Sequence, residues 1–162
     1  MFAAVLLIGP AQPPETVHAT DDDFVRFAVA ANIAEVELSK VAADHASSAA
    51  VRDFAHRMVT DHDRAGKEIK AIADTRQFPV PTALDGQHSA LKQKLLSLKG
   101  AAFDQTFMDA MVDDRKKAVA AFRDEAEHGQ DGEITAYAAK LLPTIEAHLR
   151  MAEQIDHALA TN

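Results

Sequence analysis

The 162-residue sequence contains no cysteine, and it has only six glycines and six prolines. Without cysteine the chain can form no disulfide, no thiolate metal site and no iron–sulfur cluster, and it offers no thiol nucleophile. The stability of the fold must therefore come from side-chain packing. The scarcity of glycine and proline, together with the lack of β-branched runs, favours long helices. We predict an all-α fold, and the length suits one domain with a substantial core.

Positive charge is also in short supply. Lysine and arginine number 17 against 25 aspartates and glutamates, which gives a formal net charge of −8. A chain without a basic patch cannot neutralise phosphates, so nucleic acid is excluded as a partner. Long apolar runs are missing as well. The apolar residues 1–8 are far too few to span a bilayer, and we expect no transmembrane span in the mature chain.

Residues 1–20 are typical of a signal-peptide remnant followed by a disordered arm. Small residues at Gly9 and Ala11 follow the apolar run and suit cleavage after Ala11, while Val17 and Ala19 offer a second site. The basic segment that opens a signal peptide is missing, which indicates a translation start farther upstream. We favour export, to the periplasm or the outer membrane. The alternative is a slightly apolar arm on a cytosolic protein.

Residues 21–160 are predicted to form one helical domain. Thr20 followed by three aspartates is typical of a helix start, because the capping oxygen and the acidic side chains face the positive helix end. The expected helices cover approximately 21–45, 49–76, 86–98, 103–128 and 133–160. Pro143 falls inside the last helix and should kink it.

The lengths of the connections predict the topology. Short turns join the first two long helices and the last two, so each pair should form an antiparallel hairpin. The long middle connection, which contains the short helix, can cross the length of the bundle. We therefore expect a ferritin-like four-helix bundle, in which two hairpins are joined by one crossover.

Each long helix carries an apolar seam that one ionisable residue interrupts near its middle. These residues are Glu35, His62, Asp114 and His148. Steps of four and three residues keep side chains on one helical face, so all four should point into the core. Consecutive residues point to different faces, so we expect His62, and not its neighbour Asp61, to reach the interior. Burying such a group costs roughly several kcal/mol unless it is paired, hydrogen-bonded or bound to a metal.

The four interrupting residues can share one layer of the bundle. At about 1.5 Å per residue from each turn, Glu35 lies near the level of His62, and Asp114 lies near the level of His148. Two carboxylates and two imidazoles in one layer are a ligand set for a single Fe, Mn or Zn ion. These four residues are therefore the candidate ligands of a mononuclear metal site, which is one of two interpretations of the layer.

A dinuclear carboxylate centre lacks ligands in this sequence. Such centres use Glu-x-x-His on two helices, but Val59 and Ile145 occupy the two glutamate positions here. The alternative to any metal site is a buried hydrogen-bonded network. In that network Glu35 and Asp114 pair with imidazoles or with Arg115.

Five segments carry a resemblance to a known family: AEVELSKVA (34–42), VRDFAHRMVTDH (51–62), PVPTALDGQH (79–88), GAAFDQTFMDAMVDD (100–114) and LLPTIEAHLRMAEQI (141–155). Through them the chain resembles the domain of unknown function 4142 family, which comprises exported bacterial proteins with a ferritin-like bundle. The resemblance implies an envelope location and makes Glu35, His62 and His148 recurrent polar core positions. The family's usual Asp-His appears here as Asp114-Arg115. This change replaces a possible ligand by a permanent cation, which would repel a nearby metal ion and can instead pair with Glu35 or Asp114.

We interpret five further histidines as solvated or capping: His45, His56, His88, His128 and His157. No serine lies on a seam opposite a histidine, so Ser-His-Asp catalysis has no support. We favour an exported, non-enzymatic bundle with a structural, interaction or stress-related role. The alternatives are the mononuclear metal binder and, more weakly, a ferroxidase-like enzyme. The sequence leaves the protein partner unidentified and a homo-oligomer open.

Overall fold

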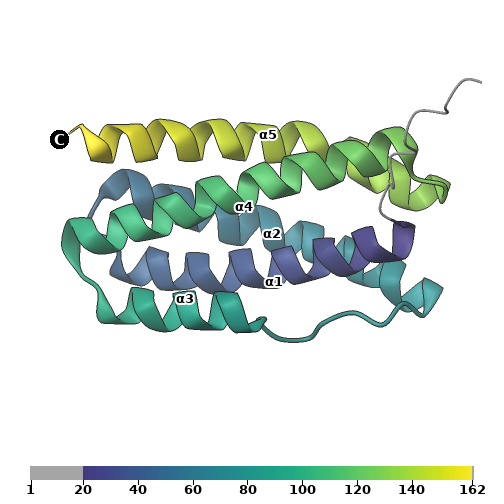
Figure 1. Cartoon of the computed structure of the whole chain (residues 1–162), viewed down its shortest axis with the longest axis horizontal. Helices are drawn as coiled ribbons and strands as arrows, with labels where there is room; N and C mark the ends of the chain where they lie inside the picture. The colour runs from purple at the N-terminus through teal and green to yellow at the C-terminus, as the bar shows by residue number, and fades with distance from the viewer. Residues whose placement is uncertain (1–19, 162) are drawn as a thin grey trace, which may run out of the picture.

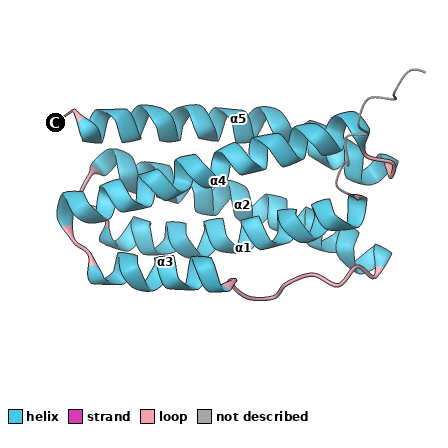
Figure 2. Cartoon of the chain, in the orientation of Figure 1, coloured by secondary structure: helices cyan, strands magenta, loops and turns pink. Residues whose placement is uncertain are grey.

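The computed structural model describes residues 20–161, which form helices joined by short turns and one longer connection (Figures 1 and 2). The helices are α1 (Asp21–His45), α2 (Ala49–Arg76), α3 (Gly86–Ser97), α4 (Gly100–His128) and α5 (Gly132–Ala160). The four long helices make the bundle, and α3 lies along its side. The all-α, ferritin-like prediction is confirmed. The signal-peptide prediction concerns residues that lie outside the described range, apart from Thr20.

The topology is two antiparallel hairpins joined by a crossover. In Figure 1, α1 and α2 form one hairpin, and the chain then returns along the bundle through residues 77–85 and α3. As a result α4 runs parallel to α2, and α5 returns antiparallel to α4. Within residues 20–161, none of the helices combines the length and the apolar character that a membrane span requires.

Local sequence signals explain the helix ends. Thr20 caps α1, because its side-chain oxygen accepts a hydrogen bond from the Asp23 amide at 3.2 Å. Gln77 ends α2 in a left-handed conformation, with a φ of 56°. Gly100 has a φ of 62° and begins α4 three residues before the predicted Phe103. Pro143 lies on the exposed side of α5 without ending the helix.

The apolar core is divided into two clusters. One contains Leu38, Met58, Phe103 and Phe107, and the other contains Phe24, Ile69, Phe122 and Ile134. On each long helix, the residues between these two clusters include the predicted polar position. The core therefore has a polar layer between two apolar halves, as the interrupted seams predict.

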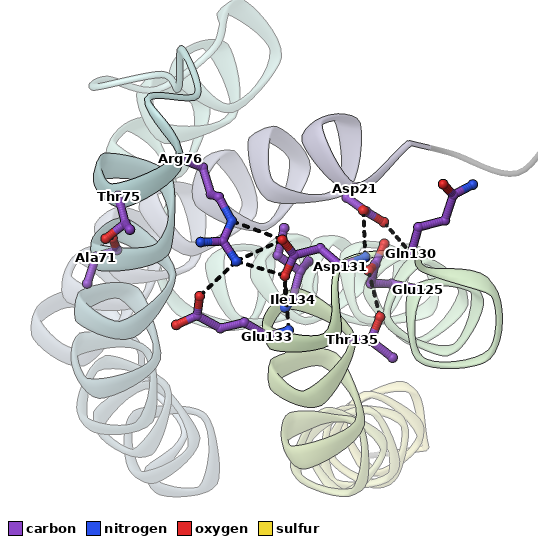
Figure 3. A network of polar contacts seen from close by, with 10 residues as sticks. All are labelled: Asp21, Ala71, Thr75, Arg76, Glu125, Gln130, Asp131, Glu133, Ile134 and Thr135. Atoms are coloured by element: carbon purple, nitrogen blue, oxygen red, sulfur yellow. Dashed lines mark hydrogen bonds and ion pairs between the residues drawn. The ribbon is translucent and has the colours of Figure 1, made fainter.

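Polar contacts fasten the end of the bundle where α1 begins (Figure 3). Arg76 at the end of α2 forms ion pairs with Asp131 at 2.7 Å and with Glu133 at 3.0 Å. The Asp21 carboxylate accepts hydrogen bonds from the backbone amides of Gln130 and Asp131 at 2.9 and 2.8 Å. The start of α1, the end of α2 and the turn between α4 and α5 are thus tied together.

A buried carboxyl group lies at the same end of the bundle. Glu125 on α4 is 3% exposed and accepts a hydrogen bond from the Thr135 hydroxyl at 3.5 Å. Burial, and then the charge of nearby Asp21, raise the pKa of Glu125 to about 7. This end of the bundle therefore carries a carboxyl group that titrates near neutral pH.

Candidate functional site

Arg115 occupies the centre of the polar layer. It is 1% exposed, and its Nη2 forms an ion pair with Oε1 of Glu35, which is 2% exposed. Its Nη1 lies 3.0 Å from Nε2 of His62. Arg115 therefore joins α4 to α1 and to α2 through a single guanidinium group. Burial raises the pKa of Glu35, while the charge of Arg115 opposes this rise.

The contacts of His62 define its protonation. A guanidinium has no acceptor atom, so Arg115 donates to Nε2 of His62, which must carry a free lone pair. The proton therefore resides on Nδ1, which donates to Oδ1 of Asn32 at 3.1 Å. Burial, followed by the charge of Arg115, holds the pKa of His62 well below its usual value. His62 is thus neutral, and both ring nitrogens are engaged.

His148 has the opposite tautomer. Its Nε2 donates to Oδ2 of Asp61 at 2.9 Å, since a carboxylate can only accept. Burial lowers the pKa of His148 to about 4, although the hydrogen bond to Asp61 opposes this shift. The ring is therefore neutral, and Nδ1 keeps a lone pair that is buried without a hydrogen-bond partner. The expectation that Asp61 stays out of the interior contacts is wrong, because its flexible side chain reaches across to α5.

Asp114 takes part in a different cluster. It accepts hydrogen bonds from His88 Nε2 at 3.2 Å and from Lys117 at 2.9 Å, and its side chain is 18% exposed. His88 also contacts Asp85, at 2.6 Å from Nδ1. Burial lowers the pKa of His88, but the hydrogen bonds to Asp85 and Asp114 outweigh it and raise the pKa above its usual value.

The interpretation of His88 as solvated or capping therefore needs correction. Its side chain is only 17% exposed and links the crossover helix α3 to α4. The sequence contains a local signal for the contact between Asp85 and His88, because the two residues are three positions apart at the start of α3. The Asp85 carboxylate caps α3 by accepting a hydrogen bond from the His88 backbone amide at 2.8 Å. The contact with Asp114, 26 residues away, had no such signal.

The structure brings together some of the four residues predicted as metal ligands. The rings of His62 and His148 lie 6.0 Å apart between centroids. Glu35 is connected to His62 only through Arg115, and the contacts of Asp114 are with His88 and Lys117. Among residues 20–161, no group of three or more histidine, aspartate or glutamate side chains is arranged to hold a metal ion. Metal binding by the four residues stays a prediction.

Beside the polar layer, a cleft of about 370 Å³ is lined by all four long helices. His62, Arg115 and His148 line it together with Asn32 and Asp61. Neither Asn32 nor Asp61 was a candidate from the sequence, because both pair with residues that are distant along the chain. The cleft connects the central network with more exposed residues on α2 and α5.

These features define a class of protein: a ferritin-like four-helix bundle with one crossover and a polar layer at its middle. The family model "Domain of unknown function (DUF4142)" matches residues 8–155 of the chain. The chain therefore belongs to the DUF4142 family, and the resemblance noted in the sequence is confirmed. No curated protein matches the chain.

Solved structures share the fold at low sequence identity. A DUF305 fragment from Deinococcus radiodurans has a TM-score of 0.75 and 16% identity, covering 90% of this chain and 99% of its own. CopM in its Cu(II)-bound form has a TM-score of 0.73 and 17% identity, with coverages of 88% and 99%. A DUF305 protein from Streptomyces coelicolor, described by its name as secreted, has a TM-score of 0.73 and 16% identity, with coverages of 87% and 93%.

Proposed function

We propose that this chain is an exported, non-enzymatic helical scaffold whose buried Glu35–Arg115–His62 network determines how its four helices pack. The observation that carries the proposal is the position of Arg115, whose permanent charge occupies the layer where bundle proteins build metal and cofactor sites. Replacing such a network by apolar residues is often tolerated, whereas breaking it is not. Its role in this scaffold is to select one packing arrangement.

The protonation of the two interior histidines supports a non-enzymatic role. A general acid or base works best when its pKa lies near the operating pH. The pKa of His148 is about 4, and that of His62 lies well below its usual value. Both imidazoles are therefore weak bases, and His62 has no free ring nitrogen for a substrate.

Export rests on the N-terminal sequence pattern and on the fold shared with a DUF305 protein whose name describes it as secreted. Fractionation of the native cells, followed by N-terminal sequencing of the recovered protein, tests it. We expect a chain outside the cytosol that begins near Gln12 or Thr20. Full-length protein confined to the cytosol would overturn the export part of the proposal.

Metal binding is a second candidate, and the shared fold with Cu(II)-bound CopM favours it. The lone pair on Nδ1 of His148 is a suitable donor for Cu, Zn, Fe or Mn, and the nearby ring of His62 becomes a second donor only if Arg115 releases its Nε2. The full set of Glu35, His62, Asp114 and His148 would place the ion beside the guanidinium of Arg115. Coordination by all four residues therefore requires Arg115 to move away, which makes this the weaker candidate.

One experiment separates the two candidates. Untagged protein is purified, its metal content is measured, and its melting temperature is recorded with added Cu(II), Zn(II), Fe(II) or Mn(II). The scaffold proposal expects far less than one equivalent of metal and no change in melting temperature. Near-stoichiometric metal and an increased melting temperature, both lost in His148→Leu and retained in the exposed control His56→Leu, would establish the metal binder instead.

A further inference from the structure

The cleft beside the polar layer has the size and composition of a small-molecule site. Its volume of about 370 Å³ lies within the usual range for ligand pockets. Most of its wall is apolar and includes three alanines, Ala28, Ala65 and Ala118, and the larger side chains of Phe122, Leu141 and Ile145. Residues of α2 and α5 line the cleft, and these are the pair of neighbouring long helices that touch each other least.

Two buried polar atoms among the lining residues have no partner within the described chain. Arg115 carries an unpaired Nε–H, which is a donor, and His148 carries an unpaired Nδ1, which is an acceptor. Both residues are nearly inaccessible, with 1% and 2% of their surface exposed. Folded proteins rarely leave buried polar atoms without a hydrogen bond. These two atoms are therefore the unused hydrogen-bonding groups that the lining residues can offer to an occupant of the cleft.

The charges around the cleft favour an uncharged occupant. Glu35 neutralises Arg115, and the two interior imidazoles are neutral. Farther out, Lys140 forms an ion pair with Glu68 at 2.6 Å across α2 and α5. Asp61 forms ion pairs with Arg57 at 3.5 Å and with Arg64 at 4.0 Å. A charged ligand would give up its hydration shell without gaining an unpaired countercharge. An uncharged polar group avoids this loss.

We propose that the cleft binds a small, uncharged amphipathic molecule of the phenol or alcohol class. A hydroxyl group both accepts and donates, so it can pair with the Nε–H of Arg115 or with the Nδ1 of His148 once a small side-chain rotation exposes either atom to the cleft. The apolar body of the molecule lies against the alanine side chains, Phe122 and Ile145. The proposal is independent of the scaffold role, because neither the export test nor the metal test depends on a ligand.

The test uses isothermal titration with a series of 4-alkylphenols, from phenol to 4-propylphenol. We expect the affinity to rise by about fourfold for each added methylene until the cleft is filled. Two matched compounds examine the head group: 4-propyltoluene, which lacks the hydroxyl, and 4-propylbenzoate, which is charged. Both should bind at least about tenfold more weakly than 4-propylphenol. Equal binding of the hydrocarbon, or tighter binding of the carboxylate, would overturn the proposal.

Variants locate the binding. Ala65→Leu partly fills the cleft while leaving every residue of the polar layer in place, and it should weaken 4-propylphenol binding by about tenfold or more. Ala71→Leu is the matched control, because Ala71 is exposed on the same helix and does not line this cleft. Nitrogen NMR should show that 4-propylphenol shifts the His148 Nδ1 resonance in the native protein. Binding that Ala65→Leu leaves unchanged would place the ligand outside the cleft, and the absence of saturable binding would mean that the cleft takes no such ligand. Either result would overturn the proposal.

Discussion

Removing Arg115 is the sharpest perturbation that the polar layer allows. Arg115→Met keeps most of the side-chain length but leaves Glu35 buried without its cation and removes the donor to His62. Breaking a buried pair from one side costs about 3–5 kcal/mol, which is a large part of a typical unfolding free energy. Glu35→Leu combined with Arg115→Met removes both charges, and this double variant should recover all but about 1–2 kcal/mol.

The loss of stability in Arg115→Met should depend on pH. Burial already raises the pKa of Glu35, and the charge of Arg115 is the main influence that opposes it. Without Arg115 the carboxyl should be protonated over a wider pH range, so its burial is penalised less in acid. The destabilisation by Arg115→Met should therefore be smaller near pH 5 than near pH 8. The double variant should lack this difference.

Urea unfolding followed by far-ultraviolet circular dichroism measures these free energies, because the chain has no tryptophan. Lys70→Met is the matched control. It breaks an ion pair with Asp74 in which both side chains are more than 60% exposed, at 65% and 63%, and it should change stability by less than about 1 kcal/mol. The reasoning is refuted if the double variant loses as much stability as Arg115→Met alone, or if Arg115→Met behaves like the control.

Three other predictions concern groups outside this pair. Glu125→Gln should stabilise the protein by about 1–3 kcal/mol near pH 8 and change its stability little near pH 4. The reason is that the folded state retains the Glu125 proton up to about pH 7, whereas the unfolded chain releases it near pH 4.5. Chemical unfolding at both pH values checks this. His148 acts in the opposite direction: the unfolded chain binds a proton near pH 6.5 and the folded protein only near pH 4, so this residue should lower stability as the pH falls through that interval, by up to about 3 kcal/mol. A His148→Gln variant with an unchanged pH slope would contradict this assignment. Asp114→Asn should weaken the contact with His88, so hydrogen exchange should become faster in α3 while α5 stays unchanged; equal protection of α3 in both proteins would count against the link.

The fold could be predicted because its signals are local. The cap at Thr20, the paired prolines that follow Phe78 and the apolar steps along each helix all act within a few residues. Among the helix ends, only the start of α4 differs appreciably from the prediction, because Gly100 adopts a left-handed φ that a pattern of apolar residues does not reveal. Helix order and turn length then left one compact arrangement.

The site could be predicted only in part, because its contacts join distant segments. The seams correctly placed Glu35 and His148 in the interior, where each is 2% exposed. They also directed Asp114 inward, whereas the neighbouring Arg115 is the residue that is fully buried. A helix turns by about 100° per residue, so two adjacent residues can both lie near the edge of an apolar seam. Which of them is buried then depends on the length and direction of its side chain. The cleft was invisible for a related reason: an alanine-rich face fits either closely packed helices or a gap.

The polar layer is assembled from residues of both hairpins, and this has a consequence for folding. Glu35 and His62 come from the first hairpin, while Arg115 and His148 come from the second. Each hairpin can form early from contacts close in sequence, but neither can neutralise its own interior charge alone. An association shifted by one turn would set the guanidinium against apolar side chains and leave Glu35 without its cation. We therefore expect the aligned pair of hairpins to be more stable than a misaligned one, because only the correct alignment pairs the buried charges.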